Sequence, residues 1–258
     1  VVIFAATQHH VEYIHMILDH NSITNTYIYS NLDASARKIN AAKFQAKKSR
    51  VLIVTDVAAR GLDIPHLDNV INFNFPAKSK LFVHRVGRCA RAGRSGTAYN
   101  IICSEEYPYL LDLHLFLGMK LNILPITGGE SSSQGAIGRM PQSMVEQELT
   151  ELNIIHNDKV DIKNMENVCN NAYQQYLRSR PGASVDSVKR AKILDIAGAG
   201  IFTDYGEAAP KVADILQQMK NYRPAGTIFE IGMKPSSVDY KVMKTKRATH
   251  KGLIDNYK

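Results

Sequence analysis

The stretch VLIVTDVAARGLDIP, from Val51 to Pro65, joins an apolar run to a polar and charged one. Val51 to Thr55 has the β-branched composition of a buried strand. Beyond it come a hydroxyl that can bond a phosphate, a glycine that permits close backbone approach and carboxylates that can accept a ribose hydroxyl. The residues that supply these groups are Thr55, Asp56, Arg60, Gly61 and Asp63. Together they indicate a nucleotide site, although Thr55 and Asp56 taken singly are also typical helix caps and Gly61 a typical turn residue.

Similar apolar runs recur on both sides of this stretch, at Val1–Ala6, Thr26–Ser30, Asn69–Phe75 and Thr97–Cys103. The segments between them carry apolar residues at helical spacing, with Val11, Ile14 and Leu18 as the clearest case. Strands that alternate with helices predict an α/β fold, a parallel sheet with helices on both faces. Because such sheets bind ligands at the carboxyl ends of their strands, we expect Thr7, Asp56 and the arginine-rich stretch described next to converge on one edge.

The arginine-rich stretch is HRVGRCARAGRSG, His84 to Gly96. Arg85, Arg88 and Arg91 lie three residues apart, which predicts one side of a single helix. Guanidinium groups match the geometry of phosphate oxygens, so this spacing suits a polyphosphate. On spacing alone, a solvated basic face is an equally good interpretation.

Composition narrows the classes of partner. The 258 residues are 45% hydrophobic, and Lys and Arg outnumber Asp and Glu by 32 to 24, a net charge of +8 that favours a polyanionic partner. No apolar run is long enough to cross a membrane, so no membrane partner is expected. Three cysteines without paired spacing argue for a reducing compartment and against a metal site. The sequence opens without Met, and we expect it to be a piece of a longer protein.

We predict three segments: a first domain over residues 1–126, a flexible linker over 127–143 that includes TGGESSSQG, and an extension over 144–258 that is mostly helical or irregular. The extension carries the basic run KVMKTKRATHK, Lys241 to Lys251, which is either a solvated tail or a nucleic-acid contact. GAGIFTDYG, from Gly198, is expected to be a flexible loop. The histidines at 9, 10, 15 and 20 are expected on the surface, and the apolar helix of residues 110–117 on the sheet.

Four segments in order resemble the second RecA-like domain of DEAD-box RNA helicases: VVIFAAT, ARKINAAKF, VLIVTDVAARGLDIP and LFVHRVGRCARAGRSGTAY. The resemblance covers Val1 to Pro125. Further along, PYLLDLHLFLG, YLRSRPGASVDSVKRAK and NYRPAGTIFEI are similar to the nucleolar DEAD-box helicases of large ribosomal subunit assembly.

The resemblance implies a role for each matching residue. Arg88 and Arg91 would contact the γ-phosphate of ATP as catalytic residues, Arg91 as the arginine finger, and Asp63 would accept the ribose hydroxyl. His84 and Arg85 would contact the partner motor domain, while RNA phosphates would be held by Thr7, Arg37 and Thr55. Ala34 replaces a glutamine that the family uses for RNA, so one contact is expected to be absent or supplied elsewhere.

The implied cofactors are ATP and Mg²⁺, with the Mg²⁺ ligands expected on a first motor domain. This sequence holds neither a GxxxxGK[ST] loop nor an Asp-Glu-Ala-Asp box, so the chain alone is expected to be inactive. The implied partners are RNA, expected to be pre-ribosomal, and proteins of pre-ribosomal particles, in the nucleus and nucleolus. The alternative from another class is a non-catalytic scaffold that binds pre-ribosomal RNA without turnover.

Overall fold

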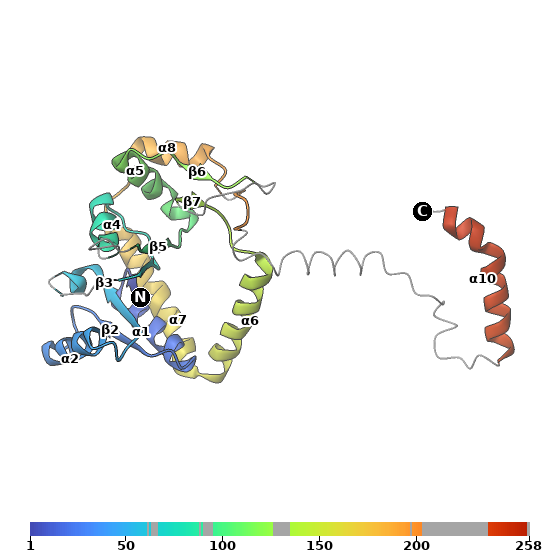
Figure 1. Cartoon of the computed structure of the whole chain (residues 1–258), viewed down its shortest axis with the longest axis horizontal. Helices are drawn as coiled ribbons and strands as arrows, with labels where there is room; N and C mark the ends of the chain where they lie inside the picture. Colours follow the sequence, from blue (N-terminus) through green and yellow to red (C-terminus); the bar gives the residue numbers. More distant parts are fainter. Residues whose placement is uncertain are drawn as a thin grey trace. The chain divides into compact units, whose positions relative to one another are not determined.

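The computed structural model describes residues 1–60, 62, 67–87, 89, 95–125, 135–196, 198–202 and 237–256, with side chains to residue 250. The chain separates into two compact units, Val1–Gly206 and Glu207–Lys258. The first unit contains the sheet and the second contains the helix α10 (Val238–Asn256), as the element labels of Figure 1 show.

The first unit is built on a five-stranded sheet with the order β2-β3-β1-β4-β5. All four neighbouring pairs are parallel. The strands are β1 (Val2–Ala5), β2 (Asn25–Ile28), β3 (Val51–Thr55), β4 (Asn69–Asn72) and β5 (Thr97–Asn100). Each begins within one residue of the start of its predicted apolar run. The predicted α/β fold with a RecA-like parallel sheet is confirmed.

Helices cover both faces of this sheet because its central strands are apolar on both sides. In β1, Val2 and Phe4 enter one core cluster while Ile3 and Ala5 enter another. The helix α1 (Gln8–His20) packs Val11 and Ile14 into the second cluster. The helix α2 (Ala34–Gln45) packs Phe44 into the first. Neighbouring residues of a strand therefore lie in different cores, because successive side chains of a strand point to opposite faces of the sheet.

Two short helices follow β3 and β4. α3 (Asp56–Ala59) begins directly where β3 ends, and α4 is Ser79–Val86. The helix predicted to carry three arginines on one side is therefore too long: α4 ends at Val86 with Gly87 as its C-cap. A Cβ on Gly87 would lie 2.8 Å from the carbonyl oxygen of Val83, which favours glycine where the helix stops.

Three helices of the predicted extension belong to the first unit. They are α6 (Gln142–Asp158), α7 (Val160–Ser179) and α8 (Val185–Ile193). α7 packs against α1, and α8 packs against α5 (Tyr107–Leu117), which follows the short helix η1 (Ser104–Glu106) (Figure 1). The predicted helical extension is thus found, and part of it covers the sheet domain. The domain boundary predicted after residue 126 remains a prediction.

The linker predicted over 127–143 is not a free connector in its described part. β7 (Ala136–Ile137) pairs with β6 (Asn122–Ile123), and α6 already begins at Gln142. The GAGIF segment, residues 198–202, lies beside this pair of strands, since the Gly200 N–H donates to the carbonyl of Leu124, the residue after β6, at 2.8 Å. A Cβ on Gly200 would lie 2.1 Å from the Pro125 carbonyl oxygen. Close backbone packing therefore explains this glycine.

The apolar helix α5 is only half covered. Leu110 and Leu113 are buried in a third cluster with Phe75, as predicted for a helix that packs on the sheet domain. At its far end Leu115 and Phe116 are 58% and 53% exposed. No described helix is both long enough and apolar enough to cross a membrane.

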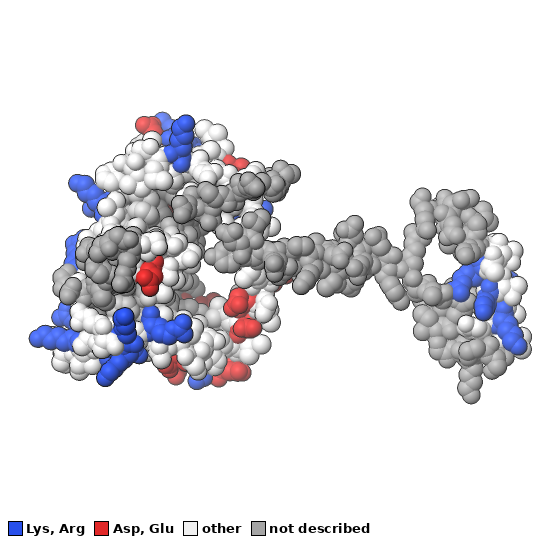
Figure 2. Space-filling view, viewed as in Figure 1, with Lys and Arg blue, Asp and Glu red and all other residues white. Residues whose placement is uncertain are grey.

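The second unit is described only through α10. Its basic run contains five Lys and Arg residues between 241 and 251 and no acidic residue. Figure 2 shows blue side chains along this helix. Both interpretations of the basic run, solvated tail and nucleic-acid contact, remain open.

The loop ends of β4 and β5 are joined by a buried carboxylate. Glu106 is 1% exposed, and its two oxygens accept the backbone N–H groups of Phe75 and Cys103, each at 3.0 Å. Burial raises the pKa of Glu106, and these two hydrogen bonds oppose that rise. The carboxylate therefore satisfies the buried backbone donor of Phe75 and the partly buried donor of Cys103.

We expect Glu106→Ala to lower the free energy of unfolding by about 1–3 kcal/mol, the cost of leaving the buried N–H of Phe75 without an acceptor. Urea denaturation measures the loss. Glu106→Gln keeps one acceptor oxygen and should lose less. Exposed Glu105→Ala is the matched control, and a loss at position 106 no larger than at position 105 would contradict this account.

Candidate functional site

The carboxyl ends of three neighbouring strands form the candidate site. β1 lies between β3 and β4 in the sheet, so the residues that follow these strands meet at one edge. Thr7 follows β1, Asp56 follows Thr55 of β3, and Asn74 follows β4. The predicted convergence of Thr7 and Asp56 on one edge is confirmed, and Arg85 of α4 joins them there.

Arg85 holds this edge together. Its guanidinium donates to both carboxylate oxygens of Asp56, through Nε at 2.6 Å and Nη2 at 2.7 Å. Its Nη1 donates to Asn72 Oδ1 and to the Asn74 carbonyl oxygen, both at 2.9 Å. The guanidinium also lies 5.0 Å from the centre of the Phe4 ring. A bidentate pair with further hydrogen bonds is the arrangement that makes a buried arginine tolerable.

The network extends to β1 through a second asparagine contact. Asn74 Oδ1 accepts the backbone N–H of Ala6 at 2.9 Å, and Asn72 donates to Asn100 Oδ1 on β5 at 2.7 Å. One arginine therefore links residues of α3 and β4, and through Asn74 the end of β1. Sequence reasoning missed both asparagines. The signal was present in INFNF, where two amides interrupt an apolar strand run.

Arg85 requires a correction. The resemblance implied that it contacts the partner motor domain, yet its side chain is 1% exposed and bonds within its own domain. Its role here is to position α4 against the end of β3. His84 on the same helix is exposed, and its contact with another domain remains a prediction.

Thr7 is both a helix cap and a predicted RNA contact. Its Oγ1 accepts the backbone N–H of His10 at 3.4 Å and lies 2.7 Å from His10 Nδ1. The residue is only partly buried. Capping therefore leaves part of its surface open at the edge of the sheet.

His10 was expected on the surface, and this was wrong. It is 9% exposed and packs against the rings of Phe73 and Tyr173, with ring centres 6.2 and 5.8 Å away. Burial lowers the pKa of His10, and the neighbouring His9 lowers it further, so the ring is neutral. The histidine lies on the apolar face of α1, where it contacts the extension helix α7.

The other two predicted RNA contacts differ in exposure. Thr55 is 8% exposed and occupies the N-cap of α3 without a capping hydrogen bond from its side chain. The alternative that it serves only as a cap is therefore not realised. Arg37, in the first turns of α2, has a buried Nε with no hydrogen-bond partner among the residues described. The Arg37 residue as a whole is only partly buried.

Asp63, Arg88 and Arg91 lie outside the described residues. Their predicted contacts with ATP therefore remain predictions. The network around Arg85 fixes the elements that lead to them along the chain, since Asp63 follows α3 by four residues and Arg88 follows Gly87 directly. Within the part of the chain that the structure describes, no three His, Cys, Asp or Glu residues gather as metal ligands.

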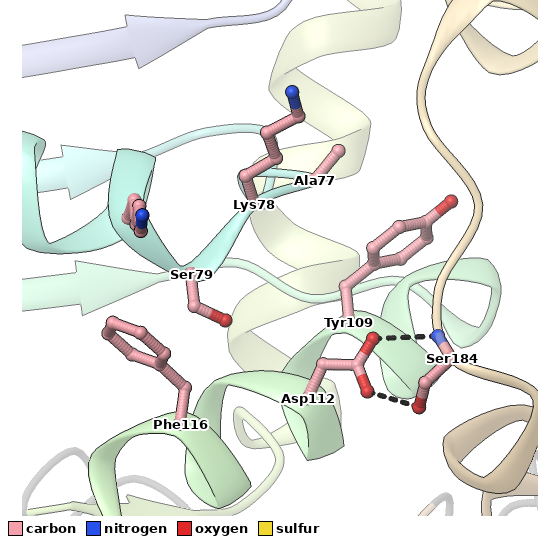
Figure 3. A pocket seen from close by; sticks show the side chains of 8 residues that line it. Ala77, Lys78, Ser79, Tyr109, Asp112, Phe116 and Ser184 are labelled. Carbon is pink, nitrogen blue, oxygen red and sulfur yellow. Dashed lines mark hydrogen bonds between the residues drawn. The ribbon is translucent and has the colours of Figure 1, made fainter.

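A second feature of the first unit is a surface pocket of about 380 Å³ where the extension joins the sheet domain. Figure 3 shows Lys78 and Ser79 of the α4 start, Phe116 of α5, and Asp112 bonded to Ser184. Asp112 accepts the N–H of Ser184 at 2.9 Å and its hydroxyl at 2.5 Å. Partial burial opposes ionisation of Asp112, but the Ser184 bonds prevail and lower its pKa. This contact anchors the start of α8.

Comparison with known proteins agrees with this geometry. Residues 1–93 match the family model described as the helicase conserved C-terminal domain. The sheet and its edge thus define the C-terminal domain of a helicase. The chain belongs to the DEAD-box RNA helicases, as the resemblance predicted.

Three relatives extend the match beyond that domain. The chain is 46% identical to mouse "ATP-dependent RNA helicase DDX54" over 99% of its length and 30% of that protein. It is 41% identical to Dictyostelium discoideum ddx54 over 99% of its length, and to Gibberella zeae DBP10 over 90%. The chain spans 24–30% of the length of these relatives. Among solved structures, a DEAD box protein from Methanococcus jannaschii is 33% identical, with a TM-score of 0.44 over 46% of this chain and 33% of that one.

The ion pair between Arg85 and Asp56 leads to a prediction about stability. We expect Asp56→Asn to lower the free energy of unfolding by about 3 kcal/mol, the low end for removing one partner of a buried pair, because Asp56 is 24% exposed and keeps some water. Urea denaturation checks this. Asp19→Asn, an exposed carboxylate on α1, is the control. Equal stability of both variants would show that Arg85 does not depend on its carboxylate.

Proposed function

We propose that this chain is the second motor domain of an ATP-dependent DEAD-box RNA helicase. The observation that carries the proposal is the buried Arg85 network. It fixes α4 against the end of β3, and these two elements lead to the arginines and the aspartate that the family uses for ATP. A domain that binds a nucleotide with both of these segments needs a fixed distance between them, and the hydrogen bonds of Arg85 hold α4 at a fixed distance from the end of β3.

RNA binding is proposed at the carboxyl ends of β1, β2 and β3, which are neighbours in the sheet. Thr7 and Thr55 end β1 and β3, and Arg37 lies on the helix that follows β2. The positive charge of Arg37, a residue that is only partly buried, supports an anionic ligand at this edge. Hydroxyl and guanidinium contacts to phosphates place a strand without reading its bases, so the binding is independent of sequence.

ATP binding is proposed for Asp63, Arg88 and Arg91. The carboxylate would accept the ribose hydroxyls, and the two guanidinium groups would meet the γ-phosphate. Arg91 would stabilise the negative charge that develops during phosphoryl transfer. Mg²⁺ would be held by the first motor domain, where it would neutralise phosphate charge. The printed names of the relatives, ATP-dependent RNA helicases, support the use of ATP.

We further propose that the helicase acts on pre-ribosomal RNA during large ribosomal subunit assembly, in the nucleolus, together with proteins of the pre-ribosomal particle. Support comes from the similarity to DDX54 and DBP10 over at least 90% of the chain, including the extension. The alternative, a scaffold without turnover, has no need of γ-phosphate ligands. The presence of Asp63, Arg88 and Arg91 in the sequence therefore favours the motor.

The arginine finger is tested in a protein that joins this chain to a first motor domain. We expect Arg91→Ala to lower RNA-stimulated ATP hydrolysis by about 10³-fold or more, the range for removing an arginine finger. RNA affinity without nucleotide should be unchanged. Arg178→Ala, an exposed arginine on α7, is the control. Unchanged turnover in Arg91→Ala would refute the finger assignment, and absence of any turnover in the parent protein would favour the scaffold.

A further inference from the structure

The extension helix α7 reaches the proposed RNA edge through a chain of three side chains. Tyr173 of α7 meets His10 of α1 edge to face, with ring centres 5.8 Å apart and ring planes at 67°. His10 Nδ1 lies 2.7 Å from the hydroxyl oxygen of Thr7. Thr7 is the residue at the end of β1 that we propose as an RNA contact. A residue 166 positions away along the chain is thus two contacts from the RNA site.

The imidazole of His10 contacts two aromatic rings. The ring centre of Phe73, after β4, lies 6.2 Å away, and Tyr173 stacks in turn on Tyr176, with ring centres 5.9 Å apart and ring planes at 26°. Edge-to-face and stacked aromatic pairs have preferred orientations and contribute about 0.5–1.5 kcal/mol each beyond burial. These contacts restrict the orientation of the His10 ring, and one of the two comes from the extension.

With the ring held beside Thr7, the tautomer of His10 decides where the single proton of the Thr7 hydroxyl points. A threonine hydroxyl has one donor hydrogen and two acceptor lone pairs, and a neutral imidazole has one donor and one acceptor nitrogen. If Nδ1 accepts, the Thr7 hydroxyl donates its only proton to His10 and has none left for a phosphate. If Nδ1–H donates, Oγ1 accepts from both the ring and the backbone N–H of His10, and its proton points outward. Only the second arrangement lets Thr7 donate to a phosphate oxygen.

We propose that Tyr173 is a positioning residue for RNA binding: it holds His10 so that the Nδ1–H of that ring donates to Thr7 and turns the Thr7 hydroxyl proton toward an RNA phosphate. The inference rests on the proposed RNA role of Thr7 and deepens it. The extension thereby raises RNA affinity without touching RNA.

A contact between α1 and another helix of the extension, α6, serves as the control. Tyr13 of α1 lies 2.8 Å from His156 Nε2 through its hydroxyl, and His156 Nδ1 lies 3.6 Å from Glu166 of α7. This contact also fastens the extension to α1, but it involves neither His10 nor Thr7. A variant here loosens docking of the extension without disturbing the three-residue chain directly.

The test measures affinity of the 258-residue chain for fluorescein-labelled oligouridylate by fluorescence anisotropy. Loss of one hydrogen bond to a charged phosphate costs about 1.5–3 kcal/mol, so Thr7→Val should weaken binding by about 10-fold or more. Tyr173→Ala should weaken it by about 3- to 10-fold, since the hydroxyl is misdirected but not removed. Tyr173→Phe keeps the ring and should bind as the parent does. Tyr13→Phe should also leave affinity unchanged.

Coupling separates positioning from a general loss of structure. In the Thr7→Val background, Tyr173→Ala and His10→Ala should cause no further loss, because both act through the missing hydroxyl. His10→Asn places an amide near the Nδ1 position and should restore part of the affinity that His10→Ala loses. The ¹⁵N chemical shifts of the imidazole should identify Nδ1 as the protonated nitrogen.

The outcomes separate two failures. If Thr7→Val binds normally, the RNA role proposed for Thr7 is wrong and this inference is overturned with it. If Thr7→Val weakens binding but Tyr173→Ala does not, the RNA role survives and the positioning role is overturned. Additive losses in the double variant, an equal loss in Tyr13→Phe, or an unprotonated Nδ1 would each overturn the positioning role as well.

Discussion

A charge buried at the edge of the sheet is the constraint on which the site depends. The guanidinium of Arg85 has almost no contact with water, so every donor it carries must find an acceptor inside the protein. Asp56 supplies two acceptors, and Asn72 and the Asn74 backbone supply one each, which accounts for four of the five N–H donors. Because these acceptors lie on separate elements, satisfying one side chain fixes the relative positions of β3, β4 and α4. A sheet edge held only by apolar contacts would tolerate sliding; directional hydrogen bonds do not.

Much of this fold could be predicted from the sequence. The five strands start within one residue of their apolar runs, because fully buried parallel strands are apolar on both faces and leave a continuous signal. Edge convergence followed from the same logic, since parallel strands direct their carboxyl ends to one side. What the pattern could not show was the end of α4 at Val86. Helical spacing of arginines beyond that residue looked like a continued helix, and Gly87 was the local signal against it.

The site was less predictable than the fold for a physical reason. Sequence pattern reports whether a residue type suits water or a core, and Arg85 and His10 are exceptions to it. Each is polar yet buried, and each is made tolerable by partners distant in sequence: Asp56 for the first, Phe73 and Tyr173 for the second. Those partnerships exist only after the strands pair and the extension docks. A resemblance to a family assigned Arg85 a contact with another domain, and burial showed that it has a different task.

The docking of α6, α7 and α8 on the sheet domain bears on where the chain can be cut. Ile155, Ile162 and Cys169 are buried on helices that a boundary at residue 126 would remove. Truncation at that residue would expose the apolar surface of α1 and α5 that these helices cover. Exposed apolar surface of this kind promotes aggregation. The family match ends at residue 93, whereas the compact unit in which these apolar faces are covered is Val1–Gly206.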